Sequence, residues 1–110
     1  MRLSVEEKKQ LDKVKAIIEA DIQKHYTIDD LAAQALMSRS KLIRVYRMHF
    51  GMALFEHLQS KRLDLGKTLL DNSSLSIKQI AQKCGYHHAC NFSTAFKHKY
   101  GQTPIAYRQG

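Results

Sequence analysis

Metal-binding residue types cluster near the C-terminal end of the sequence. Within fifteen residues, the segment CGYHHACNFSTAFKHKYG contains Cys84, His87, His88, Cys90 and His98. Cysteine thiolates and histidine imidazoles are the usual ligands of structural zinc, so a zinc site is one interpretation. However, the segment lacks a C-x2-C pair and a second ligand pair at zinc-finger spacing. Cys84 also occupies an apolar position of its predicted helix, where a cysteine is usually a small buried residue. We therefore predict no bound metal and no other cofactor.

The same segment also fits a turn at Gly85 followed by a helix from about residue 89 to residue 100. Phe92, Ala95, Phe96 and Tyr100 recur at helical spacing and would face inward. The outer face is then polar, and its asparagine can bridge N6 and N7 of an adenine. The residues predicted to read DNA bases are Cys90, Asn91, Ser93 and Thr94, and those predicted to contact phosphates are His87, His88, Lys97, His98 and Lys99.

Apolar residues recur at helical spacing, helix-capping residues precede them, and almost no strand pattern is present. The sequence therefore predicts an all-α fold of seven helices. The predicted helices cover residues 5–23, 28–36, 38–50, 53–70, 76–84 and 89–100, with a last turn that starts at Thr103-Pro104. Residues 71–74, DNSS, are predicted to form a loop. The predicted apolar positions include Leu36, Leu65 and Leu69.

Two parts of the chain repeat each other. Ile28, Leu31 and Ala32 match Ile77, Ile80 and Ala81 at an offset of 49, and Leu42, Tyr46, Phe50 and Gly51 match Phe92, Phe96, Tyr100 and Gly101 at an offset of 50. Each copy is a short helix, a tight turn and a longer helix, which is a helix-turn-helix unit. We predict a single DNA-binding module over residues 1–110, with units at about 27–51 and 76–101 and a linker helix at about 53–70.

The predicted linker helix has a length suited to DNA. At 1.5 Å per residue, about 18 residues span roughly 27 Å. Successive major grooves on one face of DNA lie about 34 Å apart. The second helices of the two units are therefore expected to bind in adjacent major grooves.

The outer face of the first unit is basic. When Leu42, Val45, Tyr46 and Phe50 of SRSKLIRVYRMHFG face inward, a stripe of residues at positions i, i+3, i+4 and i+7 faces outward. In this stripe Arg44 can donate two hydrogen bonds to O6 and N7 of guanine, and Ile43 can contact a thymine methyl group. The residues predicted to read bases are Ser40, Ile43 and Arg44, and those predicted to contact phosphates are Ser38, Arg39, Lys41 and Arg47.

Charge is unevenly distributed along the chain. The net charge is +8. Residues 1–37 contain six basic and seven acidic residues, residues 38–110 contain twelve and three, and no acidic residue follows Asp71. This asymmetry indicates a polyanionic partner, which would be either nucleic acid or an anionic membrane surface. The alternative is that the charge only makes the surface soluble. No apolar run approaches the roughly 20 residues of a membrane span. The polar start and the two cysteines indicate the cytoplasm.

The sequence offers little support for an enzyme. Glycine occurs singly, so no Gly-rich phosphate loop is present. The acidic pairs Glu6-Glu7 and Asp29-Asp30 fall at predicted helix starts, where the helix dipole favours them. We predict no catalytic activity. The alternative to DNA binding is a helical protein-interaction adaptor with a basic surface.

The segment SIKQIAQKCGYHHACNFSTAFKHKYGQTPIAYR, residues 76–108, resembles the second-unit signature of the AraC/XylS-type transcription regulators. The resemblance extends from about Val14 to Arg108. It implies two helix-turn-helix units joined by a long helix, binding to adjacent major grooves of double-stranded DNA, and control of transcription through RNA polymerase. It also implies that the module is monomeric, and that a longer regulator would sense a ligand or dimerise through a further domain.

Three residues depart from the pattern of that family. Leu54 stands where the first unit usually has proline, and His57 stands where it usually has tyrosine; both are expected to affect packing at the start of the linker helix. Thr94 stands where the second reading helix often has arginine. Because that arginine is absent, we expect the first unit to carry more of the base specificity.

Overall fold

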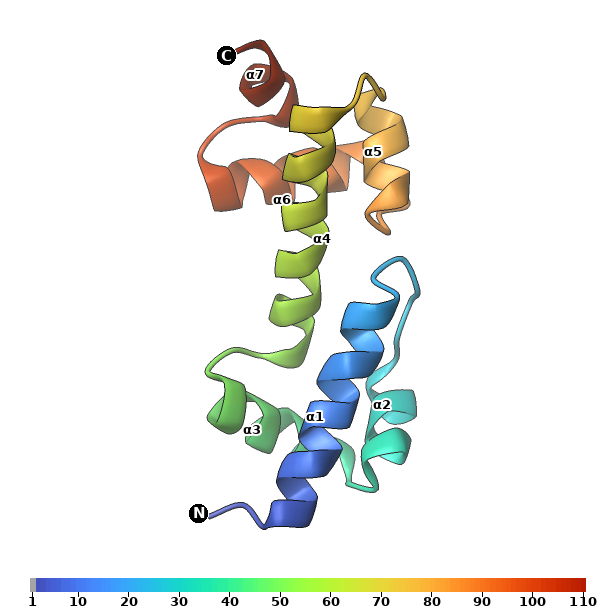
Figure 1. Ribbon diagram of the computed structural model, residues 1–110, viewed down its shortest axis with the longest axis vertical. Coiled ribbons are helices and arrows are strands. Elements are labelled where there is room, and N and C mark those ends of the chain that lie inside the picture. The colour runs from blue at the N-terminus through green and yellow to red at the C-terminus, as the bar shows by residue number, and fades with distance from the viewer. Residues whose placement is uncertain (1) are drawn as a thin grey trace. The chain divides into compact units, whose positions relative to one another are not determined.

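The computed structural model describes residues 2–110, which form seven α-helices and no strand (Figure 1). The helices are α1 (Val5–Ala20), α2 (Ile28–Ala35), α3 (Arg39–Phe50), α4 (Leu54–Asn72), α5 (Ile77–Lys83), α6 (Ala89–Tyr100) and α7 (Pro104–Gln109). The predicted all-α fold is confirmed. Met1, the first residue of the predicted module, lies outside the described residues. Among the described helices, none is long and apolar enough to cross a membrane.

The chain divides after Leu58 into two compact units, unit 1 up to Leu58 and unit 2 from Gln59 to Gly110. Unit 1 contains α1, α2, α3 and the first turn of α4, and unit 2 contains the rest of α4 with α5, α6 and α7. Each unit therefore has its own helix-turn-helix, α2–α3 in unit 1 and α5–α6 in unit 2.

Side-chain caps fix most of the helix starts. Ser4 and Glu7 form a reciprocal capping box, with both hydrogen bonds at 3.0 Å. Ser76 and Gln79 form a second one at the start of α5. Such a cap satisfies backbone N–H groups that have no partner in the helix, and it contributes about 1 kcal/mol. Thr27, Ser38 and Thr103 cap α2, α3 and α7 in the same way.

Two helix ends differ from the predicted ones by more than one residue. α1 ends at Ala20, where the Tyr26 hydroxyl lies 3.0 Å from the Ile17 carbonyl oxygen and 2.6 Å from the Asp21 carbonyl oxygen and donates its one hydrogen to this pair of terminal acceptors. α4 continues through Asp71 and Asn72, which were predicted to be loop. There the side-chain amide of Asn72 donates a hydrogen bond to the Thr68 backbone carbonyl at 3.0 Å, which supports the last turn of the helix.

The core of unit 1 is formed by inward faces of all its helices. Its buried side chains include Leu11, Val14, Ile18, Leu31, Leu42, Val45, Tyr46, Leu54 and Leu58. Leu36, predicted to be apolar and inward, is instead 81% exposed. It adopts a left-handed backbone with φ of 56° and forms the turn between α2 and α3.

The core of unit 2 is built around α6. Phe92 and Phe96 are fully buried and pack with Leu63, Leu70, Ile80, Ala81 and Cys84. Leu65 and Leu69, the predicted apolar positions of this part of α4, are only partly buried. The closest approach is at Gly66, where an added Cβ would lie 2.6 Å from an edge carbon of the Phe92 ring. Gly66 thus allows α6 to pack directly on α4.

We expect Gly66→Ala to destabilise unit 2. The added methyl group would displace the buried Phe92 ring. Overpacking of this kind costs about 1–3 kcal/mol, which exceeds the gain of roughly 1 kcal/mol in helix propensity. Urea unfolding measures the effect, and Thr68→Ala, an exposed position on the same helix, is the control. A Gly66→Ala protein as stable as the parent would contradict this packing.

The last helix is anchored by the Tyr-Arg pair of the quoted signature. The Tyr107 hydroxyl donates to Asp71 at 2.7 Å. The Arg108 guanidinium donates to the carbonyl oxygens of Leu75 and, at 3.2 Å, of Ser73. These bonds hold α7 against the end of α4, so the pair has a structural role.

Candidate nucleic-acid interface

The second helix of unit 1, α3, presents a basic stripe to solvent. Ser40, Ile43, Arg44 and Arg47 are all exposed. Ile43 is 53% exposed, so its apolar side chain is accessible to an external group. The Arg44 and Arg47 guanidinium groups form no ion pair or hydrogen bond with any residue of the described range 2–110. Both groups are therefore available to an external acceptor.

Two other basic residues of this helix already have acidic partners. Arg39 Nε lies 3.0 Å from Asp29 Oδ1, and Lys41 Nζ lies 2.5 Å from Glu7 Oε2. The hydrogen bond from Lys41, followed by those from Ser4, lowers the pKa of Glu7 to about 2. Exposed ion pairs of this kind are weak. Contact between these two residues and phosphates stays a prediction, and it requires each to exchange a carboxylate for a phosphate.

Ser38, also predicted to contact phosphate, serves as the cap of α3. Its hydroxyl oxygen accepts a hydrogen bond from the Lys41 backbone N–H at 3.2 Å. Its own O–H remains available as a donor. Ser38 can therefore cap α3 and donate a hydrogen bond to a phosphate at the same time, and the phosphate contact stays a prediction.

The second helix of unit 2, α6, presents a more mixed surface. Cys90, Asn91, Thr94, Lys97 and His98 are exposed, whereas Ser93 is only partly exposed. The Thr94 hydroxyl donates to the Cys90 carbonyl at 2.9 Å. Thr94 thus has its donor engaged within the helix, and it offers outward its methyl group and the acceptor lone pairs of its hydroxyl oxygen.

His87 and His88 lie in the turn that precedes α6. Both are exposed, and His88 occupies the cap position without making a side-chain cap bond. Their proposed phosphate contacts stay predictions.

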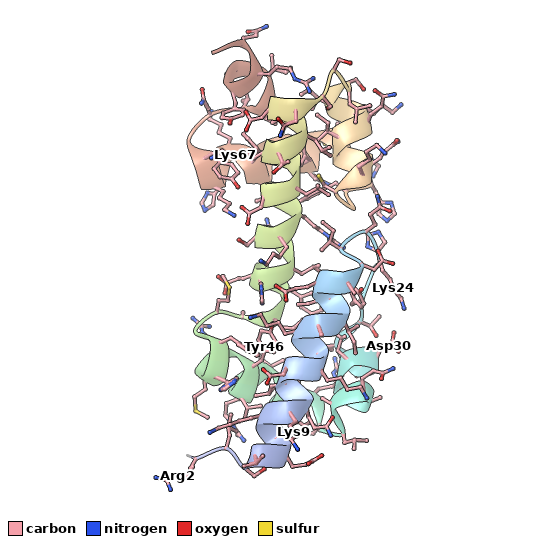
Figure 2. All side chains as sticks on the ribbon, viewed as in Figure 1. Arg2, Lys9, Lys24, Asp30, Tyr46 and Lys67 are labelled. Carbon is pink, nitrogen blue, oxygen red and sulfur yellow. The ribbon has the colours of Figure 1, made fainter. Side chains whose placement is uncertain are left out.

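Lys99 is directed toward α4. Its ammonium lies 2.7 Å from Asp64 Oδ1 and 2.9 Å from Ser60 Oγ. Although partial burial raises the pKa of Asp64, hydrogen bonds from Lys99 and Tyr100 outweigh this and hold it below its ordinary value. α4 is further attached to α6 by Lys67, labelled in Figure 2, whose ammonium lies 5.1 Å from the centre of the Tyr100 ring. Lys99 is thus positioned to stabilise unit 2, and this geometry does not favour its predicted phosphate contact.

The two cysteines have different environments. Cys84 is fully buried, as the sequence predicted, and Cys90 is exposed. Burial raises the pKa of the Cys84 thiol to about 11, which opposes the thiolate form that binds metal. Within residues 2–110, no group of three or more histidine, cysteine or acidic residues could hold a metal ion.

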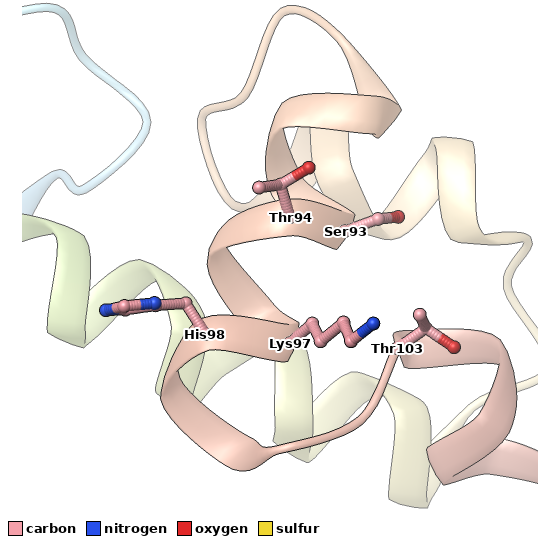
Figure 3. Close-up of a pocket in the computed structure, with 5 residues that line it drawn as sticks. All are labelled: Ser93, Thr94, Lys97, His98 and Thr103. Atoms are coloured by element: carbon pink, nitrogen blue, oxygen red, sulfur yellow. The ribbon is translucent and has the colours of Figure 1, made fainter.

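A hollow of about 650 Å³ lies beside α6. Its lining residues are Ser93, Thr94, Lys97, His98 and Thr103 (Figure 3). Four of these were predicted from the sequence to contact DNA. Thr103 was recognised only as a helix cap, because helical spacing within α6 carries no signal for a residue of the next element.

Comparisons with known proteins agree with this arrangement. Residues 31–110 match the sequence pattern of the family described as a helix-turn-helix domain. The chain is 40% identical over 100 residues to the HTH-type transcriptional regulator AlkR of Acinetobacter baylyi, covering 91% of this chain and 33% of AlkR. It is 30% identical to the HTH-type transcriptional activator RhaR of Mannheimia succiniciproducens, covering 89% of this chain and 36% of that protein. The chain thus spans about a third of the length of these curated relatives.

Solved structures give the same result. The DNA-binding domain of AdpA, a global transcriptional factor crystallised with a target DNA, has a TM-score of 0.85 at 29% identity, with 91% of this chain and 90% of that chain covered. An AraC-type regulator from Chromobacterium violaceum has a TM-score of 0.81 at 26% identity, with 96% and 95% covered. The chain therefore belongs to the AraC-type helix-turn-helix transcription regulators, as its sequence signature predicted.

Proposed function

We propose that this chain is the DNA-binding part of a transcription regulator, and that α3 and α6 bind in adjacent major grooves of double-stranded DNA. The observation that carries the proposal is the exposed stripe of α3, where Arg44 and Arg47 have no acidic partner within residues 2–110. The solved relative that contains a target DNA supports it. The repeat of the helix-turn-helix supports the use of both units.

The proposed contacts divide into two kinds. Arg44, Ile43 and Ser40 in unit 1, and Asn91 and Thr94 in unit 2, would contact base edges, which carry sequence information. Lysines and arginines around them would contact phosphates, which fix orientation and supply most of the sequence-independent affinity. The excess of nine positive charges in residues 38–110 suits that second role.

Other parts of the function follow from the same proposal. RNA polymerase is the proposed protein partner, and the cytoplasm is the proposed location. We propose that this part of the protein binds DNA as a monomer, and that a longer protein would dimerise through regions outside this chain. The family is one of transcription regulators, so neither catalysis nor the adaptor alternative is favoured.

A salt titration and a footprint test the proposal. A site selected from random duplex DNA should bind about 10³-fold more weakly at 200 mM than at 50 mM salt, as expected for six or more phosphate contacts. Hydroxyl-radical footprinting should show two protected segments roughly 10 bp apart on one face of the duplex. A DNA affinity that does not change with salt concentration would favour the alternative function, a helical protein-interaction adaptor. A single protected segment would mean that only one unit engages DNA.

A further inference from the structure

The hollow beside α6 gathers three hydrogen-bond donors at one end. Ser93 and Lys97 are one helical turn apart on α6, and Thr103 is the cap residue of α7. Figure 3 shows the Lys97 side chain extending toward Thr103, with Ser93 on the same side and His98 directed away. The three residues thus come from two consecutive helices and meet around one space.

The donors of these side chains are available. The Ser93 hydroxyl and the Lys97 ammonium form no hydrogen bond or ion pair with other residues in the described part of the chain. Thr103 Oγ1 accepts from the Ala106 backbone N–H at 3.2 Å, which leaves its O–H free to donate. None of the described residues that line the hollow carries a carboxylate. One positive charge and two hydroxyl donors suit a group with one negative charge and several acceptor oxygens, such as a phosphodiester.

The internal repeat provides a contrast within the same chain. At the offset of 50, the positions of Ser93, Lys97 and Thr103 correspond to Ile43, Arg47 and Ala53. Unit 1 thus keeps a cation but has no hydroxyl group at either of the other positions. In unit 1 the Ala53 backbone N–H instead donates a hydrogen bond to Glu56 Oε1 at 3.4 Å. The residue that corresponds to Glu56 in unit 2 is Ala106, which has no carboxylate. The polar hollow is therefore a feature of unit 2.

We propose that this hollow seats one phosphate of the DNA backbone, held by Ser93, Lys97 and Thr103. Ser93 was predicted from the sequence to read a base, and this proposal makes it a phosphate ligand. The inference rests on the proposed function, and it adds that unit 2 is fixed on DNA by a contact that unit 1 lacks. Cys90, Asn91 and Thr94 are left as the base-facing residues of α6.

A methylphosphonate scan tests the proposal. Single uncharged linkages are placed along the half-site bound by unit 2, in a duplex selected as above. One linkage should weaken binding of the parent chain about 10-fold, the equivalent of roughly one charge-assisted hydrogen-bonded contact. The Ser93→Ala/Lys97→Met variant should bind the unmodified duplex about 10-fold more weakly, and should lose little more at that linkage. If the affinity loss caused by the double variant multiplies with the loss caused by the uncharged linkage at every position, the variant and the phosphate act independently and the proposal is overturned.

Base preference provides a second readout. Ser93→Ala should weaken all sequences alike, by about 3-fold to 10-fold, without changing the selected site. A relaxed preference at one base pair would return Ser93 to base reading and overturn the proposal. Thr103→Ser keeps both the cap and the hydroxyl and should bind as the parent does. Ile105→Ala, an exposed change on α7 outside the hollow, should have no effect.

Inorganic phosphate separates a backbone phosphate from a free one. Titrated into the DNA-free chain and followed by amide chemical shifts of residues 93–103, it should not saturate at millimolar concentration. Saturation below that range, lost in Ser93→Ala/Lys97→Met, would mean a free-anion site and would overturn the proposal. If the chain binds no duplex at all, the proposed function itself is wrong. If it binds the duplex but the Ser93→Ala/Lys97→Met variant and the methylphosphonate linkages act independently, only the proposed phosphate site in the hollow is wrong.

Discussion

Arg44→Ala is expected to flatten base preference at one position of the half-site bound by unit 1. A guanidinium that donates two hydrogen bonds to O6 and N7 of guanine gives about 1–3 kcal/mol of discrimination against other bases. Arg44 is exposed, lies on the outward stripe of α3 and has no competing partner within residues 2–110. Binding to a set of single-base variants of the selected site, at fixed salt, measures the effect.

Arg47→Ala on the same helix is the matched control. Arg47 lies three residues further along α3 and is proposed to contact phosphate. Its loss should weaken binding to all variants alike and lower the slope of affinity against salt by about one. Base preference relaxed by Arg47→Ala but not by Arg44→Ala would reverse these two assignments.

The two units are expected to read DNA unequally. The Thr94 O–H is donated to the Cys90 carbonyl, so this residue can offer a base its methyl group and a hydroxyl acceptor, but no donor. Asn91 is therefore proposed as the principal polar base reader of α6. If Asn91→Ala or Thr94→Ala relaxes base preference more than Arg44→Ala does, the unequal division is wrong.

Local sequence signals predicted most of the fold. Capping residues and glycine at helix ends act over three or four residues, so Ser4, Ser76 and Gly101 mark the boundaries that the structure shows. The inward stripes of α3 and α6 follow from helical spacing alone. The outward faces, and with them most of the candidate site residues, follow as the complement of those stripes.

Features that depend on contacts between distant residues were not predictable in this way. Helical spacing placed Lys99 beside Lys97 as a phosphate ligand, but its ammonium is bound by Asp64, which lies 35 residues earlier in the chain. The contact of the Tyr26 hydroxyl with the carbonyl oxygens of Ile17 and Asp21, at the end of α1, joins residues nine and five positions apart. The hollow depends on Thr103, the cap residue of α7, whereas the other lining residues belong to α6. In each case the deciding partner lies outside the helix that the local pattern describes.

The departure from the family pattern at His57 has a specific structural consequence. His57 is buried, and its Nδ1 lies 2.7 Å from the hydroxyl of the fully buried Tyr46. Its Nε2 lies 3.4 Å from Glu19 Oε2. Burial, with a contribution from the charge of Glu19, raises the pKa of Tyr46 above its ordinary value. The Tyr46 hydroxyl therefore stays protonated and forms a buried hydrogen bond with His57 Nδ1.

This chain of polar contacts links three helices of unit 1. Tyr46, labelled in Figure 2, belongs to α3, His57 to α4 and Glu19 to α1. Because Tyr46 lies on the inner face of the proposed reading helix, the network helps to fix that helix in place. A buried polar group that loses its partner costs about 1–3 kcal/mol, whereas replacing both partners by apolar groups is nearly neutral.

Tyr46→Phe and His57→Leu are each expected to destabilise unit 1 by about 1–3 kcal/mol, because each leaves one buried polar group without its partner. The double variant should lose less than the sum of the two, by about 1–2 kcal/mol, since neither polar group remains. Hydrogen exchange of the α1 and α3 amides reports the stability of this unit separately from unit 2. His49→Leu, at an exposed position of α3, is the control and should change stability by less than about 0.5 kcal/mol. Additive losses in the double variant would show that Tyr46 and His57 contribute independently, and the hydrogen bond would then not be what fixes α3.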